Sequence, residues 1–485
     1  MTTLVWFRQD LRTSDHDALL DACARGAVVP VFIWYPNSEG RWPIGGAQRW
    51  WLHHSLLRLA EDLKSRGSRL VIRTGDPAVE LASVARACAA KRVVCSRRYE
   101  PAAMADEERI TEVLQKSGVE LCRIGSNLLF DPFVIRTQTG TAYKVFTPFW
   151  RACLTRPAPE APRQAPATIP APATWPAGLE VDALQLLPEI PWDAGLQQMW
   201  IPGEASARAR LLAFVAGPIG QYSLQRDIPG AHGTSMLGAH LHFGELSPRE
   251  AWHAVQHAIR GRAGEFTANA EKFRAELGWR EFGAHVLANF PRTAEDPLRI
   301  DFRKFPWRSN AVELRAWQRG RTGYPIVDAG MRQLLHTGWM HNRVRMVVGS
   351  FLVKHLRMDW MHGARWFWDT LVDADLASNT LGWQWAGGCG ADAAPYFRIF
   401  NPMTQGKKFD PEGAYVKRWV PELAGVPAEY IHAPWEAPPL ALAMSGVTLG
   451  ETYPYPIVDH AKARAAALQA LSAVSGKSVT ASDDV

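Results

Sequence analysis

The first third of the chain alternates short apolar runs with amphipathic segments. The runs have the length of buried strands, and the segments between them repeat apolar residues at helical spacing. We predict strands over 4–7, 28–35, 69–72, 92–95 and 119–124, and helices over 14–24, 47–66, 77–89 and 102–117. This alternation predicts a parallel sheet covered by helices. The first strand leads into Arg8-Gln9-Asp10 and not into a glycine-rich turn, so it does not open a dinucleotide-binding unit.

The pattern changes after the predicted sheet. Prolines recur between 155 and 202, where they break any helix or central strand. From Ala205 to about 470 the apolar positions follow a helical period with short Gly/Pro interruptions. We therefore expect an α/β plus all-α fold with four parts: a parallel-sheet α/β domain over 1–130, a Pro-rich connector over 131–202, a helical domain over 203–473 and a flexible tail over 474–485.

Composition adds limits to this organisation. A chain of 485 residues with 47% hydrophobic and 21% charged residues is typical of a soluble protein with two or three domains. No stretch has the length of a membrane span or the form of a signal peptide, and the six cysteines form no C-x-x-C pair. We expect a reduced, cytoplasmic protein with no metal centre, and nothing demands more than a monomer. The net charge of +6 is compatible with a polyanionic partner such as nucleic acid.

Two helical faces combine polar and aromatic residues. Asp375, Asn379 and Trp383 are spaced i, i+4, i+8, while Asn342, Arg345 and Met346 are spaced i, i+3, i+4. For any one of these residues, a core position or a structural ion pair is the more common role. Together they suit a bound planar heteroaromatic ring, which needs both packing surface and polar groups at its edge. The chain is also rich in tryptophan, with 21 residues.

Two further stretches carry candidate chemistry. Tyr222 and the segment Thr234–Gly238 offer hydroxyl and backbone N–H groups that suit phosphate, although a plain helix cap explains the segment alone. Glu276, Trp279 and Arg280 share a helical face, and an ordinary Glu–Arg pair is as good an interpretation of them. Gly476-Lys477-Ser478 lacks the first glycine of a phosphate loop, and His240 with His242 has no further ligand at metal spacing.

A resemblance emerges from several longer segments. They are 4–12 (LVWFRQDLR), 233–235 (GTS), 276–282 (ELGWREF), 322–329 (TGYPIVDA), 338–346 (GWMHNRVRM), 373–385 (DADLASNTLGWQW) and 392–402 (DAAPYFRIFNP). With these segments the chain resembles class I cyclobutane pyrimidine dimer photolyases of the photolyase/cryptochrome family, over nearly its whole length. The resemblance implies a light-driven DNA-repair enzyme that holds FAD in the helical domain.

The resemblance also assigns roles to residues. The implied FAD contacts are Tyr222, Thr234, Ser235, Met236, Leu237, Gly238, Phe273, Arg345, Asp373, Ala374, Asp375 and Asn379. Arg345 is expected to pair with Asp373, and the neutral amide of Asn379 is expected at the flavin N5, where it suits either protonation state. Trp383, Trp360 and Trp307 match the family's chain of three tryptophans, which passes electrons to a photoexcited flavin.

The DNA side of the site follows from the same resemblance. A damaged base pair flips out of the duplex cheaply, and the pocket that takes it is expected to stack on aromatic rings. The implied contacts to UV-damaged DNA are Glu276, Trp279, Arg280, Asn342, Arg343, Met346, Trp385 and Gln405, with Glu276 acting in catalysis on the 5′ base. The alternative is a flavin blue-light sensor of the cryptochrome type, which has no use for this set.

The light-harvesting antenna of the family is left open. Folate-binding members carry Asn-Glu shortly after a Tyr-Glu pair, whereas Tyr99-Glu100 is followed here by Pro-Ala-Ala, and Asp296 stands where a lysine is expected. A folate antenna is therefore doubtful, and a deazaflavin, another flavin or no antenna all stay open.

Overall fold

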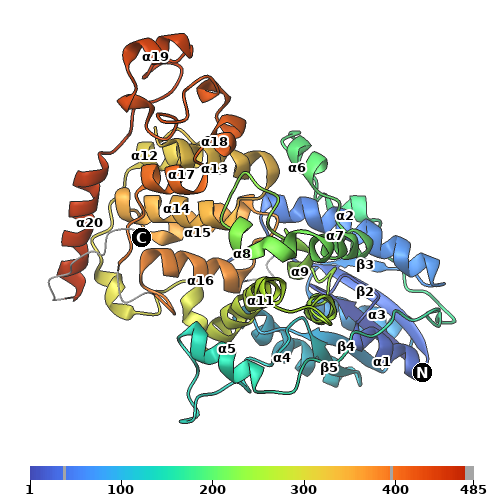
Figure 1. Cartoon of the computed structure of the whole chain (residues 1–485). Helices are drawn as coiled ribbons and strands as arrows, with labels where there is room; N and C mark the ends of the chain where they lie inside the picture. Colours follow the sequence, from blue (N-terminus) through green and yellow to red (C-terminus); the bar gives the residue numbers. More distant parts are fainter. Residues whose placement is uncertain (37–39, 394–396, 476–485) are drawn as a thin grey trace. The chain divides into compact units, whose positions relative to one another are not determined.

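The computed structural model describes residues 1–36, 40–393 and 397–475 (Figure 1). The contacts between residues divide the chain into two compact units. Among the described residues, the first unit lies within 1–220, 235–291 and 372–375, and the second lies within 221–234, 292–371 and 376–475. The chain enters each unit more than once, so neither unit is one continuous stretch. The four-part division expected from the sequence stays a prediction. Gly476-Lys477-Ser478 and all but the first two residues of the expected tail lie outside the described residues.

The first unit is built on a five-stranded parallel sheet (Figure 1). Its strands are β1 (Thr2–Phe7), β2 (Ala27–Trp34), β3 (Val71–Thr74), β4 (Arg92–Arg97) and β5 (Glu120–Ser126), in the order β3-β2-β1-β4-β5. The intervening helices are α1 (Asp17–Arg25), α2 (Gly46–Ser65), α3 (Pro77–Ala87) and α4 (Pro101–Lys116). The expected alternation is confirmed. The central strand β1 is buried from Leu4 to Phe7, as expected of a strand covered on both faces.

One face of this sheet carries α3 and α4. Leu4 and Trp6 of β1 pack in a cluster with Leu81 and Val84 of α3 and with Ile110 of α4. Because side chains alternate along a strand, Val5 and Phe7 point to the opposite face. The ring of Phe7 lies 4.8 Å from that of His16, just before α1. The apolar runs of the sequence therefore form strands that are buried on both faces of the sheet.

Helix α1 begins at Asp17, three residues later than the sequence pattern predicts. Asp15 has a φ of +50° and cannot continue a helix, and the side chain of His16 caps the helix by accepting from Leu19 N. Asp15 is held there by an ion pair with Arg249 at 2.8 Å and by the backbone N–H of Arg163. Long-range contacts of one buried carboxylate thus set the start of the helix.

The rest of the first unit is helical with a long irregular connector. Its helices include α5 (Phe146–Leu154), η1 (Val181–Leu184), α6 (Ala194–Met199), α7 (Glu204–Ala216), α9 (Gly238–His242), α10 (Pro248–Ala258) and α11 (Glu265–Asn289). The Pro-rich stretch lies along the sheet, since Pro170 O accepts from Val28 N and Leu179 pairs with Ile72 in an isolated bridge.

The second unit is helical, as the sequence pattern predicts. Its α-helices are α8 (Tyr222–Gln225), α12 (Ala311–Gln318), α13 (Pro325–Thr337), α14 (Asn342–Ser350), α15 (Trp360–Thr370), α16 (Leu376–Gly387), α17 (Pro402–Phe409), α18 (Ala414–Trp419), α19 (Pro439–Met444) and α20 (His460–Ser475). A π-helical turn, η5 (Phe351–His355), follows α14. None of the helices in the described part of the chain combines the length and apolarity needed to cross a bilayer.

Candidate functional site

Helix α11 of the first unit carries three of the predicted site residues. Glu276, Trp279 and Arg280 are all half-buried on this helix. The helix lies close to α5, because a Cβ added to Gly278 would be 2.6 Å from the ring of Trp150. Only glycine permits this approach. The close packing against α5 fixes the position of α11 and of the residues next to Gly278.

Trp279 is held by an aromatic contact that the sequence did not indicate. Its ring stacks on that of Phe146, the first residue of α5, with a centroid distance of 3.9 Å and an interplanar angle of 9°. The two residues lie far apart in the chain, so no local pattern predicts the pair. Stacking fixes the plane of the indole, as a ring that receives a flipped base requires.

Arg280 and Glu281 join α11 by hydrogen bonds to the segment directly after β5 and to α9. The guanidinium of Arg280 donates to Asn127 O at 2.8 Å and to Leu241 O at 3.3 Å. The buried carboxylate of Glu281 accepts from the backbone N–H groups of Leu129 and Phe130 at 2.9 and 3.1 Å. Burial raises the pKa of Glu281 to about 7. The guanidinium of Arg280 therefore binds backbone carbonyls of its own unit. A contact between Arg280 and DNA stays a prediction.

The predicted phosphate segment meets an acidic segment within the first unit. Gly238 begins α9, and a Cβ added there would lie 2.8 Å from a carboxylate oxygen of Asp373. The neighbouring Ala374 is held by Gln48 of α2, whose Nε2 donates to Ala374 O at 2.7 Å. His242 Nδ1 of α9 lies 3.5 Å from Asp375. The fold thus brings backbone donors and carboxylates together from segments far apart in the sequence.

A buried carboxylate, that of Glu245, holds α9 through His240. Glu245 is fully buried, and its Oε1 accepts from Trp51 Nε1, Ser55 Oγ and Gly203 N at 3.1, 2.7 and 2.7 Å. Its Oε2 lies 2.5 Å from Nδ1 of His240. His240 is therefore held by a buried carboxylate. The sequence pattern did not single out Glu245, since a lone glutamate carries no spacing signal.

In the second unit, α14 presents the predicted residues Asn342, Arg345 and Met346. Asn342 is exposed, and the other two are half-buried. Arg345 Nε donates to Met340 O at 2.7 Å, which orients its guanidinium. Arg343 pairs with Asp227 at 2.9 Å and lies over the ring of Phe409 at 4.4 Å. A DNA contact by Arg343 and the pairing of Arg345 with Asp373 stay predictions.

The start of α14 depends on a neutral histidine. His341 is buried, and its Nδ1 accepts from Arg343 N as the helix cap. Burial lowers its pKa to about 4, and the nearby Arg226, Arg343 and Arg345 act in the same direction while Asp227 opposes them. The folded protein therefore binds this proton less readily than the unfolded chain, and stability falls as the pH drops from about 6.5 to about 4.

We expect a His341→Asn variant to keep the helix cap while losing this pH dependence. Asparagine caps helices well and does not titrate in this range. Between pH 7 and pH 5 the variant should lose about 2 kcal/mol less of its free energy of unfolding than the wild type. Denaturant titrations at the two pH values measure the difference. Equal losses would show that His341 binds its proton equally well in the folded protein and in the unfolded chain, so that burial does not lower its pKa. Burial also lowers the pKa values of His285 and His355, so the variant should still lose some stability between pH 7 and pH 5.

Helix α16 carries Asn379 and Trp383, which are both buried. Asn379 Nδ2 donates to Ala364 O of α15 at 2.9 Å. This contact fixes the orientation of the amide, and among the described residues its Oδ1 accepts no hydrogen bond. The atom left for a ligand is therefore an acceptor. Asp375 lies just before the helix, so the predicted i, i+4, i+8 face is helical only from Leu376 onward.

The three tryptophans of the predicted electron path all lie in the second unit. Trp383 and Trp360 are buried, whereas Trp307 is half-buried and packs on Phe305 at 4.3 Å. Trp383 lies tightly against α15, since a Cβ added to Gly363 would overlap its Cη2. The exposure of the rings suits a path that begins at the surface. The path itself stays a prediction.

The remaining predicted residues differ in exposure. Tyr222 is buried with the Arg226 guanidinium 5.2 Å from its ring centre, and Phe273 is buried against Phe214 at 4.6 Å. Trp385 is half-buried, 6.4 Å from Phe400. Gln405 is only 4% exposed. A contact between Gln405 and the DNA backbone would need this side chain to move outward, and it stays a prediction.

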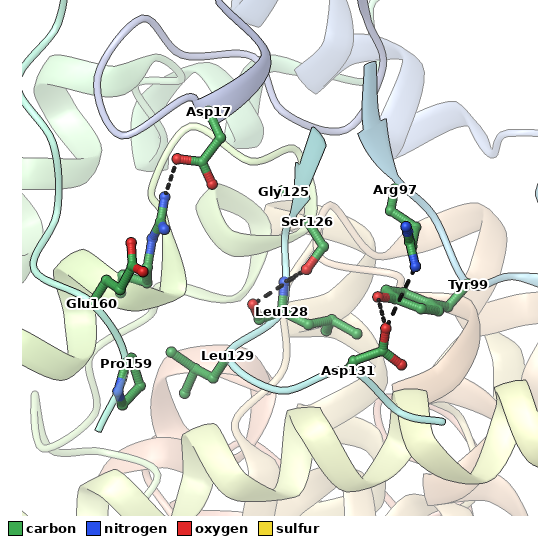
Figure 2. Close-up of a pocket in the computed structure, with 11 residues that line it drawn as sticks. Asp17, Arg97, Tyr99, Gly125, Ser126, Leu128, Leu129, Asp131, Pro159 and Glu160 are labelled. Carbon is green, nitrogen blue, oxygen red and sulfur yellow. Dashed lines mark hydrogen bonds and ion pairs between the residues drawn. The ribbon is translucent and has the colours of Figure 1, made fainter. Parts of the chain in front are cut away.

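A pocket of about 330 Å³ lies at the ends of β4 and β5 (Figure 2). Asp131 accepts from Tyr99 at 3.1 Å and lies 3.6 Å from Arg97, and Asp17 pairs with Arg249 at 2.9 Å. The charged groups around it therefore neutralise one another. Nearby, Glu100 pairs with Arg98 at 3.0 Å. These contacts do not identify an antenna, which stays open.

Comparisons with known proteins fit this geometry. Residues 3–171 match the family model for DNA photolyase, and residues 273–473 match that for the FAD binding domain of DNA photolyase. The chain is 47% identical to the deoxyribodipyrimidine photo-lyase of Agrobacterium fabrum, over 97% of this chain and 98% of that protein. The chain belongs to the photolyase/cryptochrome family. The expected family, photo-lyase class of enzyme and FAD cofactor are thereby confirmed.

Two further relatives define the breadth of the similarity. Cryptochrome-2 of Arabidopsis thaliana is 39% identical over 97% of this chain and 78% of that protein. The solved structure of a bacterial class III photolyase from Agrobacterium tumefaciens superposes with a TM-score of 0.93 at 46% identity, covering 98% of each chain. The α/β plus helical architecture is thus that of photolyase structures. The class within the family and the lesion that is repaired stay predictions.

The residues of each unit fit FAD chemically. In the first unit, the backbone at Gly238 meets the carboxylate of Asp373, so donors for phosphate and an acceptor for hydroxyl or ring N–H groups occur together. In the second unit, Asn379 leaves an amide oxygen without a protein donor among the described residues. Each of these is a feature that a ligand with phosphates, hydroxyls and a polar ring edge can satisfy.

Proposed function

We propose that this protein repairs cyclobutane pyrimidine dimers in DNA with blue light. The observation that supports the proposal is the arrangement on α11, where a half-buried carboxylate, Glu276, shares a helical face with a stacked and half-buried ring, Trp279. A carboxyl beside an indole suits a pyrimidine that has been flipped from the duplex, because the ring takes the face of the base and the carboxyl its polar edge.

When bound, reduced FAD supplies one electron on absorbing light and takes it back after the dimer has split. Both bonds that join the two pyrimidines break, and no net oxidation occurs. We assign the phosphate and ribitol side to Tyr222 and to the segment 234–238, with Phe273, Arg345 and 373–375 as further contacts. The Oδ1 of Asn379 would accept a hydrogen bond from an N5–H group of bound flavin, which would favour the reduced form.

The chain's own residues would prepare the substrate. Trp279 and Trp385 would stack on the flipped pyrimidines, at roughly 1–3 kcal/mol per base. Glu276 would hydrogen-bond the 5′ base and share a proton with it while it holds the extra electron. Asn342 and Met346 are further predicted contacts to the dimer. Contacts by Arg280, Arg343 and Gln405 to the DNA, a monomeric state and a class I assignment are separate predictions, on which this chemistry does not depend.

The direct test uses protein purified in the dark. It is incubated under reductant with an oligonucleotide carrying one thymine cyclobutane dimer, and restored thymines are scored with and without blue light. A (6-4) lesion is run in parallel. Restoration of the cyclobutane substrate alone, and only in light, is the expected result. Restoration of the (6-4) lesion alone would overturn the assigned substrate.

A flavin light sensor is the second candidate function, because the plant cryptochrome similarity covers nearly the whole chain. A sensor needs a photoreducible flavin but no lesion pocket. Bound FAD that reduces in light, together with no repair of either lesion, would favour the sensor. The absorption spectrum of the same sample would show whether an antenna accompanies the flavin.

We expect a Glu276→Ala variant to keep FAD while its repair yield falls about tenfold, because the variant cannot make one hydrogen bond to a charged group in the reacting complex. Glu271→Ala is the matched control, since Glu271 lies on the same helix and pairs with Arg274. Repair per absorbed photon on pre-reduced protein measures the effect. An unchanged yield in the Glu276 variant would remove this residue from the mechanism.

A further inference from the structure

A basic loop, residues 132–145, is the second part of the segment between β5 and α5 in the first unit, after Asp131. From Pro132 to Pro159 the loop and the helix after it carry four cationic residues and no Asp or Glu; they are Arg136, Lys144, Arg151 and Arg156. None of the four forms an ion pair with a carboxylate in the part of the chain that the structure describes. This differs from the pocket of Figure 2, where arginines and carboxylates are paired. No ion pair among the described residues therefore offsets the positive charge of these four side chains.

The loop lines a pocket of about 640 Å³. Arg136 and Lys144 contribute to its wall, together with two threonines, Thr137 and Thr141, and the ring of Phe290. Lys144 is exposed, and its ammonium lies 5.1 Å from the centre of the Phe290 ring. A ring steadies a cation without neutralising it. The pocket thus offers charge and hydroxyl donors on one surface, as a phosphate group requires.

The loop is a built feature, because α11 clamps both of its ends. His285 Nε2 accepts from Tyr143 N at 3.0 Å, and its Nδ1 lies 2.9 Å from Pro132 O. Asn289 also donates to Pro132 O at 3.1 Å. Inside the loop, Thr137 Oγ1 lies 2.8 Å from Thr141 Oγ1. These hydrogen bonds hold the loop in one shape, so its cations are placed before any partner arrives.

The loop is also joined to the proposed lesion contact. Phe146 follows Lys144 by two residues and stacks on Trp279. Two residues of chain span at most about 7 Å. Successive phosphates of one strand are separated by a rise of about 3.4 Å. If Trp279 stacks on the flipped pyrimidine, Lys144 is held within a few nucleotides of the lesion.

We propose that Arg136 and Lys144 of the basic loop bind a DNA backbone phosphate beside the lesion. The inference rests on the proposed function for the position of the lesion. Charge complementarity carries it: a preformed cationic pocket without carboxylates meets a polyanion. The role of the loop is to hold the duplex in register while Trp279 and Glu276 engage the base, as phosphate contacts do in other DNA complexes.

The test compares two double variants. Arg136→Ala with Lys144→Ala removes the two pocket cations, and Arg86→Ala with Lys116→Ala is the control, since both of its cations are exposed at the ends of α3 and α4. The dissociation constant for a duplex with one thymine dimer is measured at several salt concentrations. In the loop variant the slope of log affinity against log salt should become shallower by about 0.9 for each phosphate that the protein no longer neutralises. The control should keep the wild-type slope.

Methylphosphonates at single positions along both strands then locate the phosphate. At the position that the loop binds, neutralisation should weaken the wild type and the control several-fold and leave the loop variant unchanged. FAD content and the unfolding midpoint, measured on all proteins, identify a misfolded variant, and Lys144→Ala alone replaces the double variant in that case. Wild-type slopes in the loop variant, or no position that couples to it, would overturn the proposal.

The two proposals can fail independently. Undamaged duplex carries the same phosphates, so the loop variant should lower its affinity even if the protein repairs nothing. Repair by the wild type with unaltered binding by the loop variant would refute only the loop assignment. A shallower salt slope in the loop variant without any repair by the wild type would refute only the repair function.

Discussion

A Trp383→Phe variant should lose most of its capacity to photoreduce oxidised FAD. Phenylalanine is far harder to oxidise than tryptophan, so the first donor of the predicted path would be missing. Trp383 is buried in the second unit and lies against Phe367 at 4.9 Å and Trp317 at 6.1 Å. We expect the photoreduction rate under blue light and external reductant to fall by more than an order of magnitude. Repair by the same variant should persist once its FAD has been reduced chemically.

Trp317→Phe is the matched control for this experiment. Trp317 is fully buried, touches Trp383 and donates its N–H to Val348 O at 3.1 Å, but it does not belong to the predicted path. Its variant reproduces the packing defect and loses one hydrogen bond, but it leaves every electron donor of the predicted path in place. If both variants slow photoreduction equally, packing and not electron donation is the cause. If pre-reduced Trp383→Phe fails to repair, the separation of photoreduction from repair is wrong.

Replacing Glu245 with alanine should lower the free energy of unfolding by about 3–5 kcal/mol. The change leaves Trp51 Nε1, Ser55 Oγ and Gly203 N without their acceptor in a buried site, and it removes the partner of His240. These donors come from α2, from the start of α7 and from α9. Unfolding in denaturant measures the decrease.

The same substitution should weaken FAD retention. Glu245 holds His240, and α9 begins at Gly238, where the predicted phosphate segment ends. Loosening of α9 should therefore raise the fraction of apoprotein after gel filtration. Glu61→Ala is the control, because Glu61 is an exposed partner of Arg58 and such surface pairs contribute little. A Glu245 variant as stable as this control would show that the donors find water or other acceptors.

The sequence by itself determined the order of the elements. Alternating apolar runs predicted β1 to β5 and the helices between them, because a strand covered on both faces must be apolar throughout. Helical periodicity predicted the second half of the chain as helices. Local spacing also placed Glu276, Trp279 and Arg280 on one helix, since residues three and four apart share a face. The longer motifs indicated the family and its cofactor.

The tertiary structure decided which groups meet. Spacing shows the face on which Arg280 lies, but only the fold brings the carbonyls of Asn127 and Leu241 within its reach. The stack of Trp279 on Phe146 and the hydrogen bonds of Glu245 join segments that are remote in the chain. No local pattern encodes such interactions, because they depend on how the whole chain packs. The start of α1 differs from the predicted start for the same reason, since Arg249 holds Asp15 in a non-helical conformation.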